Sequence, residues 1–280
     1  AGLSTDEYEN TSGGINALDS LSAGNATDNT AIGYDAGTAV TTGDKNTAVG
    51  SYALDANTTA SYNTGVGYDA LTDNTTGAQN TAVGYNALAN NTTASFNIAI
   101  GSETLFTNTT GTSNAVVGQA ALYNNTTGSE NTALGQSALN ANTTANDNVA
   151  VGAYALKATT TGGNNVGVGN SALVANTTGT NHVAVGHYAL SANTTGTNNV
   201  AVGKNSLLSN TTGDDNTAVG YQALDANTTG EYNVAVGKDA LGANTTGQKQ
   251  VAIGMNALFT NTDGEYNTAV GEGALYNNNA

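Results

Sequence analysis

Small, branched and polar positions recur along this chain with a period of 17 residues. The consensus unit is Asn-Thr/Val-Ala-Val-Gly-x-x-Ala-Leu-x-x-Asn-Thr-Thr-Gly-x-x. No insertion or deletion breaks the register between the first and last full units, so the chain is a repeat protein. The glycine of the Val-Gly or Ile-Gly pair marks fifteen units, at Gly33, Gly50, Gly67, Gly84, Gly101, Gly118, Gly135, Gly152, Gly169, Gly186, Gly203, Gly220, Gly237, Gly254 and Gly271.

Two apolar positions are nearly constant between the units. The residue before the marker glycine is Val or Ile in fourteen of fifteen units, and Leu134 is the exception. Four residues after the glycine, Leu occurs in fourteen of fifteen units, and only Gly37 differs. A disordered low-complexity tract does not need a branched residue at a fixed position. We therefore expect a folded core. An imperfect unit, marked by Gly14, comes 19 residues before Gly33.

The pattern predicts an all-β fold, a parallel β-solenoid of about 16 coils with a 17-residue repeat. Such a unit is too short for a pair of helices, and its Gly and Asn-Thr-Thr-Gly segments divide it into strands and turns. Two strands per unit are expected, one ending near Val-Gly and one near Ala-Leu. Residues 1–13 are interpreted as an N-terminal lead-in and residues 14–280 as one continuous array. At about 4.8 Å per coil, the array would be a rod on the order of 75 Å long.

Polar residues also form columns in this repeat. Asn opens almost every unit, from Asn29 to Asn267, and only His182 and Gln250 replace it. Stacked coils would align these side chains, and aligned amides can hydrogen-bond along the stack. Gln keeps that bond and His keeps part of it. The Asn-Thr-Thr segments predict a second polar ladder at a turn. The two residues after that turn vary freely and are expected to be solvated.

The Ala-Val and Ala-Leu pairs bear on the oligomeric state, because adjacent side chains of a strand point to opposite faces. In one arrangement the alanines fill a narrow coil and stripes of Val and Leu lie outside. These stripes would expose more apolar surface than the few hundred Å² typical of a monomer. The opposite arrangement, with Val and Leu inside, allows a monomer. We favour the first, and hence an oligomer, because one buried Val and one buried Leu return only about 3–6 kcal/mol. Ordering 17 residues costs roughly 1–2 kcal/mol each.

Composition and charge make several partners unfavourable. The chain has no cysteine, so a disulfide framework and a thiolate metal site are excluded. Five Lys and no Arg face 21 carboxylates, for a net charge of −16. Nucleic acid and anionic membrane surfaces are therefore not expected as partners. No apolar run reaches the roughly 18–20 residues of a membrane span, so membrane insertion is not expected either.

Candidate chemistry is sparse, and the chain is predicted not to be an enzyme. His182 and His187 lie in different columns of one unit, and ladder and surface positions explain them better than a metal pair. The segments Gly65-Val66-Gly67 and Gly167-Val168-Gly169 replace the alanine of the repeat by glycine and lack the rest of a dinucleotide-binding motif. No catalytic residue, cofactor or metal site is predicted, while incidental Ca²⁺ binding at the acidic surface stays open.

The Asn-Thr-Thr triplets also match the acceptor pattern for N-glycosylation. A hydrogen-bonding turn already explains the triplet, so modification is an alternative reading of the same residues. The candidate acceptors are Asn57, Asn74, Asn91, Asn125, Asn176, Asn193 and Asn227.

Tyrosines decorate the variable columns, where they are expected to face solvent. Exposed rings spaced along a solenoid can stack on sugars or contact a protein surface, and they are also common on flat β surfaces. Both interpretations stay open. These residues are Tyr34, Tyr68, Tyr85 and Tyr221 after the marker glycine, and Tyr62, Tyr232 and Tyr266 before the Asn column.

The unit at residues 80–89, Asn-Thr-Ala-Val-Gly-Tyr-Asn-Ala-Leu-Ala, resembles the head repeat of the YadA-type trimeric autotransporter adhesins. Those units read roughly Ser-x-Ala-Ile-Gly-x-x-Ala-x-Ala. It is similar also to repeats of phage tail fibres and of large surface proteins of aquatic bacteria. The resemblance covers about residues 14–280. It implies a left-handed parallel β-roll with three chains side by side, outside a cell or virion. The chain departs from the adhesin pattern in its longer period, its Asn-Thr-Thr-Gly turn and the lack of a recognisable stalk or membrane anchor.

Three functions are compatible with the sequence. The expected one is an extracellular fibre segment, a trimeric head or shaft that attaches to a host glycan or protein through many weak contacts. The second is a structural filament whose subunits stack end to end, because the terminal coils look uncapped and uncapped coils associate. The third is an ice-binding solenoid that uses the regular threonine column.

Overall fold

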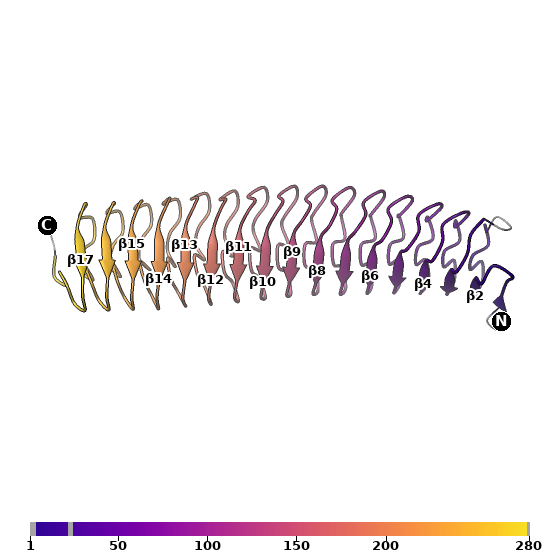
Figure 1. Cartoon of the computed structure of the whole chain (residues 1–280), viewed down its shortest axis with the longest axis horizontal. Coiled ribbons are helices and arrows are strands. Elements are labelled where there is room, and N and C mark those ends of the chain that lie inside the picture. The colour runs from indigo at the N-terminus through magenta and orange to yellow at the C-terminus, as the bar shows by residue number, and fades with distance from the viewer. Residues whose placement is uncertain (1–3, 22–24, 279–280) are drawn as a thin grey trace. The chain divides into compact units, whose positions relative to one another are not determined.

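The computed structural model describes residues 4–21 and 25–278. It contains two compact units, Ala1–Thr144 and Ala145–Ala280, here called the first and second units. In each unit the 17-residue repeats form coils of a parallel β-solenoid, and each coil contributes one short strand (Figure 1). The described residues contain no helix. The predicted fold class is thereby confirmed.

The strands of both units have the same length and register. From β3 onward every strand has three residues, and each pairs in parallel with the equivalent residues one repeat later, as Ala48 does with Gly65. The first unit contains β1 (Ser4–Thr5), β2 (Thr11–Gly13), β3 (Thr30–Ile32), β4 (Thr47–Val49), β5 (Thr64–Val66), β6 (Thr81–Val83), β7 (Ile98–Ile100), β8 (Ala115–Val117) and β9 (Thr132–Leu134). The second unit contains β10 (Val149–Val151), β11 (Val166–Val168), β12 (Val183–Val185), β13 (Val200–Val202), β14 (Thr217–Val219), β15 (Val234–Val236), β16 (Val251–Ile253) and β17 (Thr268–Val270).

The second strand expected near Ala-Leu is not formed in any described coil, and that prediction was wrong. The segment is a series of turns in which two residues adopt left-handed backbone conformations, for example Tyr52 (φ 60°) and Leu54 (φ 53°). It still bonds to the neighbouring coils, because the Leu54 amide donates to Ala70 O (3.0 Å) and the Tyr52 amide to Tyr34 O (2.9 Å). A left-handed residue cannot continue an extended strand, so the chain bends at each of these positions.

This bend changes which side chains form the core. In the strand, the middle Ala82 is fully buried, while Thr81 and Val83 on either side face outward. In the bent segment Ala87 and Leu88 are both fully buried. The predicted arrangement, with Ala inside and Val and Leu outside, was therefore right for the Ala-Val pair and wrong for the Ala-Leu pair. The leucine column lies inside the coil, because its residues are not in a strand.

The marker glycines are required by close contact between coils. Gly84 has a φ of 140°, a region open essentially only to glycine. A β-carbon at this position would lie 2.4 Å from the carbonyl oxygen of Gly101 in the next coil. Because that neighbour is backbone, no side-chain rotation can relieve the overlap.

Gly37, the one break in the leucine column, is compensated locally. It adopts the same left-handed conformation as the leucines, with a φ of 57°. Leu18 Cδ2 and Val40 Cγ2 lie 3.1 and 3.6 Å from the position of its missing β-carbon. Val40 is itself 1% exposed and replaces the Asn of the Asn-Thr-Thr triplet in this coil. An apolar pair therefore fills the space that Leu fills in the other coils.

The first coil starts inside the segment interpreted as a lead-in. Strand β2 pairs in parallel with β3, so that Thr11 is opposite Thr30. Strand β1 pairs antiparallel with β2 and covers its other edge, and the Asp6 carboxylate accepts hydrogen bonds from the amides of Tyr8 and Asn10 in the turn between them. This end of the first unit, expected to be uncapped, therefore has a paired edge.

Two glycine-to-alanine substitutions in the first unit should have opposite consequences. Gly84→Ala places a β-carbon against backbone and should lower the free energy of unfolding by at least about 3 kcal/mol. Gly65→Ala restores the alanine of the other coils, and it should be neutral or stabilising by up to about 1 kcal/mol. Urea unfolding followed by circular dichroism measures both. Equal effects of the two substitutions would contradict the contact between coils at Gly84.

Candidate functional site

A buried ladder of asparagine amides runs through the coils of each unit, at the position that opens the repeat. In the first unit, Asn97 Oδ1 accepts hydrogen bonds from the Asn114 amide (3.0 Å) and from Asn114 Nδ2 (3.1 Å). Asn97 Nδ2 donates to Gly111 O (2.9 Å). Both side chains are almost fully buried. The predicted amide ladder is confirmed, and it carries backbone amides as well as side chains.

A second buried ladder is formed by the asparagines of the Asn-Thr-Thr triplets. Asn108 Nδ2 donates to Asn91 Oδ1 (3.0 Å), and Asn125 Nδ2 donates to Asn108 Oδ1 (2.8 Å). Asn108 Nδ2 also donates to Gly111 O (2.9 Å), the same carbonyl that accepts from the first ladder. The two ladders thus meet at one carbonyl in most coils. The predicted second ladder is confirmed.

The threonines of the triplet differ in their environment. The first one bonds to the next coil, as Thr75 Oγ1 does to Thr92 O (2.9 Å). The second one is exposed, and this column contains Thr in thirteen consecutive coils, from Thr42 to Thr246. The hydroxyls of the first threonine column therefore hydrogen-bond between coils, while those of the second column face solvent.

The triplet asparagines are poor acceptors for glycosylation in the folded chain. Asn91, like the other candidate acceptors, is fully buried. Its Nδ2 donates to Asn74 Oδ1 (2.8 Å) and to Ala94 O (2.9 Å). A glycan on this nitrogen would remove a donor from the ladder and could not reach solvent. Modification would have to precede folding.

His182 replaces Asn in the first ladder and keeps its bonds. Its amide donates to Asn165 Oδ1 (3.0 Å), and its Nδ1 accepts from the Asn199 amide (3.2 Å). Its Nε2 lies 2.7 Å from Gly196 O, so the neutral form with the proton on Nε2 fits the site. Burial lowers the pKa of His182 to about 4. His187 is exposed.

Gln250, the other replacement, connects the two ladders. Its amide donates to Asn233 Oδ1 (3.1 Å), and its Nε2 donates to Asn244 Oδ1 (2.8 Å) in the second ladder. Its Oε1 accepts from Asn261 Nδ2. The prediction that Gln would keep the bond along its own column holds only for its backbone amide, because its side chain bonds to the second ladder instead.

Each unit presents one face of its sheet to solvent, here called the outward sheet face. We define it by the first and third residues of strands β3–β9 in the first unit and β10–β17 in the second. Every one of these positions holds Thr, Val, Ile, Leu or Ala, and none is charged. Third-column side chains are partly exposed, for example Ile100 (39%) and Val117 (40%) in the first unit and Ile253 (41%) in the second. The face therefore presents β-branched side chains to solvent in a two-column array.

Three exposed tyrosines and the partly buried Tyr52 form a row in the first unit, which we call the tyrosine row: Tyr34, Tyr52, Tyr68 and Tyr85. Their ring centroids are separated by 5.4 Å, 5.8 Å and 5.7 Å in that order. The first two pairs meet edge to face, and Tyr68 and Tyr85 are nearly parallel. Tyr52 was not anticipated, because it stands one residue later in its unit than the other three.

Carboxylates surround the tyrosine row. The charge of Asp69 is the main cause that raises the pKa of the Tyr68 phenol, while burial, together with Tyr34 and Asp35, raises that of Tyr52. Burial raises the pKa of Asp69, and the neighbouring Asp55 and Asp73 add to this. These groups therefore lie close enough to form one negatively charged aromatic surface.

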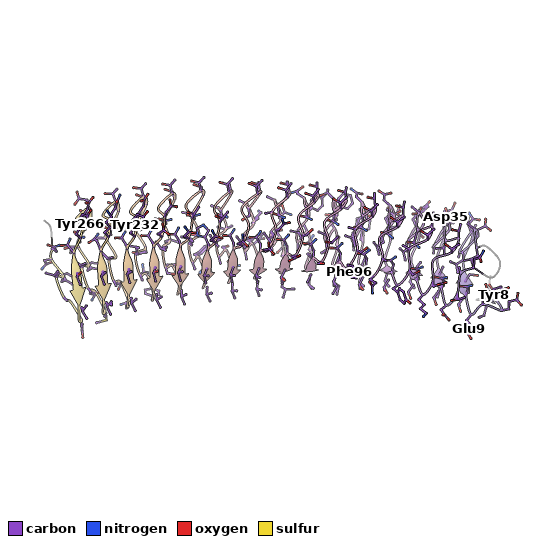
Figure 2. The ribbon with its side chains drawn as sticks, turned by 45° about the horizontal axis from the view of Figure 1, so that its top comes forward. Tyr8, Glu9, Asp35, Phe96, Tyr232 and Tyr266 are labelled. Carbon is purple, nitrogen blue, oxygen red and sulfur yellow. The ribbon has the colours of Figure 1, made fainter. Side chains whose placement is uncertain are left out.

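The remaining candidate tyrosines are exposed but isolated from one another. Tyr232 and Tyr266 lie along the same side of the second unit (Figure 2). Lys249 Nζ lies 5.0 Å from the centroid of Tyr266, and in the first unit Lys45 Nζ lies 5.4 Å from that of Tyr62. Tyr62 and Tyr266 thus already have a cation from the chain itself.

Comparison of the chain with protein-family models and with curated proteins gave no match. Within residues 4–21 and 25–278 there is no group of His, Cys, Asp or Glu side chains that could hold a metal ion, and no pocket. Nor does this part of the chain contain a helix long and apolar enough to cross a membrane. The candidate surfaces are therefore the outward sheet face and the tyrosine row.

Removing one rung of the second ladder should destabilise the fold. Asn108→Ala leaves Asn91 Oδ1 without its donor and removes an acceptor from Asn125, so we expect a loss of about 2–4 kcal/mol in the free energy of unfolding. Asn90→Ala, at a partly exposed position of the same unit, is the matched control and should change it by less than about 0.5 kcal/mol. Chemical unfolding compares them. Similar losses would show that the ladder contributes little.

His182 should make stability depend on pH in a defined window. Because its pKa falls from 6.5 to about 4 on folding, the unfolded chain takes up the proton first as the pH drops. Stability is therefore lost between about pH 6.5 and pH 4, by up to about 3 kcal/mol. His182→Asn restores the ladder residue and should remove this part of the pH dependence, whereas His187→Asn should not. Unfolding curves at pH 7 and pH 4.5 test this, and an unchanged dependence in His182→Asn would contradict it.

Proposed function

We propose that this β-solenoid repeat protein is a structural module of an extracellular fibre, built from three copies that pack through the outward sheet face. The single observation that carries the proposal is that face. It is an array of mostly β-branched residues without a charge, and large exposed apolar patches mark interaction sites.

Charge favours the same face as the contact between copies. The chain carries a net charge of −16, so two copies repel each other wherever their carboxylates approach. The outward sheet face has no carboxylate in its columns, and unlike the equally uncharged threonine column from Thr42 to Thr246 it also presents Val, Ile and Leu side chains. Since buried apolar area stabilises association by roughly 25 cal/mol per Å², a strip that continues over many coils can hold copies together. The resemblance to trimeric adhesin repeats supports three copies and a location on a cell or virion surface.

An ice-binding role has less support. The outward sheet face has Thr in its first column at Thr47, Thr64 and Thr81, but Ile98 and Ala115 interrupt this column. In the second unit Val replaces Thr at most of these positions. A regular lattice of hydroxyls therefore covers only part of the face.

The alternative of a filament stacked end to end also has less support, because the edge of β2 is already paired with β1 and is not open for stacking.

Molar mass in solution tests the proposal. By light scattering after gel filtration, the wild-type chain of 27.7 kDa should elute at three times its mass. The double substitution Val66→Asp with Val83→Asp puts two charges on the outward sheet face and should yield single chains of unchanged circular dichroism. Thr59→Asp with Thr76→Asp, on the exposed threonine column, adds the same charge and should leave the trimer intact. A single-chain wild type would overturn the proposal, and long polymers would favour end-to-end stacking.

A further inference from the structure

The tyrosine row has an unmatched negative charge. It lies among Asp35, Asp55, Asp69 and Asp73, and the only ion pair between described side chains is far from it in sequence, joining Lys238 and Asp239. Tyr34, Tyr68 and Tyr85 each expose close to half of their surface. Asp35 and Asp55 accept hydrogen bonds from Asn16 Nδ2 and Thr72 Oγ1, but no described lysine forms an ion pair with any of the four carboxylates. An exposed aromatic face next to carboxylates without a cation attracts organic cations, through the ring and through the charge.

Other tyrosines of the chain have a lysine of the same chain over the ring. Lysine ammonium groups lie over Tyr62, Tyr154 and Tyr266, at 5.4, 5.2 and 5.0 Å from the ring centroids. Three of the five lysines are therefore engaged over tyrosine rings. No lysine among the described residues lies over a ring of the tyrosine row. The surface with the most rings and carboxylates is thus left without a cation from its own chain.

We infer that the tyrosine row binds a Lys- or Arg-bearing segment of a partner protein, laid along the coils. The rings follow one another at intervals of 5.4–5.8 Å, so a row of cationic side chains can contact several rings in succession. A second copy of this chain is a poor partner, because it has no Arg and most of its lysines are already engaged. A neutral glycan could stack on the rings but would leave the carboxylates uncompensated. The inference goes beyond the proposed fibre module and does not depend on assembly into a trimer.

Fluorescence anisotropy with two labelled peptides provides the test. One peptide alternates Arg and Gly, and the other carries citrulline in place of every Arg. The full chain should bind the Arg peptide at least about tenfold more tightly. Tyr68→Leu with Tyr85→Leu should weaken that binding roughly tenfold, as should Asp69→Asn with Asp73→Asn. Circular dichroism of each variant verifies that the fold is retained.

Matched controls separate the site from general attraction to a polyanion. Tyr221→Leu removes an exposed ring from the same column of another coil, and Glu130→Gln with Asp147→Asn removes two exposed charges away from the row. Both should leave the affinity within about twofold. Equal weakening by the controls, or equal binding of the citrulline peptide, would overturn the inference, as would tighter binding of an uncharged oligosaccharide. Molar masses of the same samples show separately whether the proposed trimer forms.

Discussion

The buried asparagine ladders are the constraint on which the rest of this structure depends. A buried amide without a partner costs about 1–3 kcal/mol, and most coils bury two asparagine side chains. Their partners are supplied in part by the neighbouring coils, as Asn108 shows by donating to Asn91 and accepting from Asn125. A single coil would leave these groups unsatisfied. Coils are therefore stable only as a stack, the nearest-neighbour behaviour typical of solenoids.

The ladders also explain why the period is so strict. In most coils both ladders meet at one backbone carbonyl, such as Gly111 O, so an inserted residue between them would move one ladder away from it. The marker glycine adds a second restriction, since the backbone of the next coil occupies the place of its side chain. The replacements in these columns either keep hydrogen bonds to the neighbouring coils or put apolar side chains in place of the usual Leu and Asn. His182 and Gln250 are examples of the first kind, and Val40 with Gly37 is an example of the second.

The sequence was sufficient to predict the solenoid, its period and both asparagine ladders, because each depends on a residue type that recurs at a fixed position. It was insufficient for the Ala-Leu segment. There, alternation suggested a strand, but Leu88 and its equivalents adopt a positive φ that no propensity of leucine predicts. In this conformation the Leu88 amide bonds to Thr104 O of the next coil, and the leucine column lies in the core instead of on the surface. The tyrosine row was predicted only in part, since Tyr52 joins it from a different column.

The buried and the exposed columns of the repeat consequently have different roles in this chain. The interior columns satisfy hydrogen bonds and packing and hardly vary, whereas the exposed columns carry tyrosines, carboxylates and lysines that differ from coil to coil. Recognition is expected in those variable columns and on the outward sheet face. The repeated fold supplies spacing, and the exposed residues supply the chemistry.

Hydrogen exchange of side-chain amides tests the central claim most directly. With asparagine labelled by ¹⁵N, NMR can follow the Nδ2 protons of ladder residues such as Asn97 and Asn108 beside those of the less buried Asn90 and Asn198. If the ladders hold the coils together, the ladder protons should exchange orders of magnitude more slowly, at rates close to those of the protected strand amides. Exchange of ladder and surface amides at the same fast rate would contradict the account.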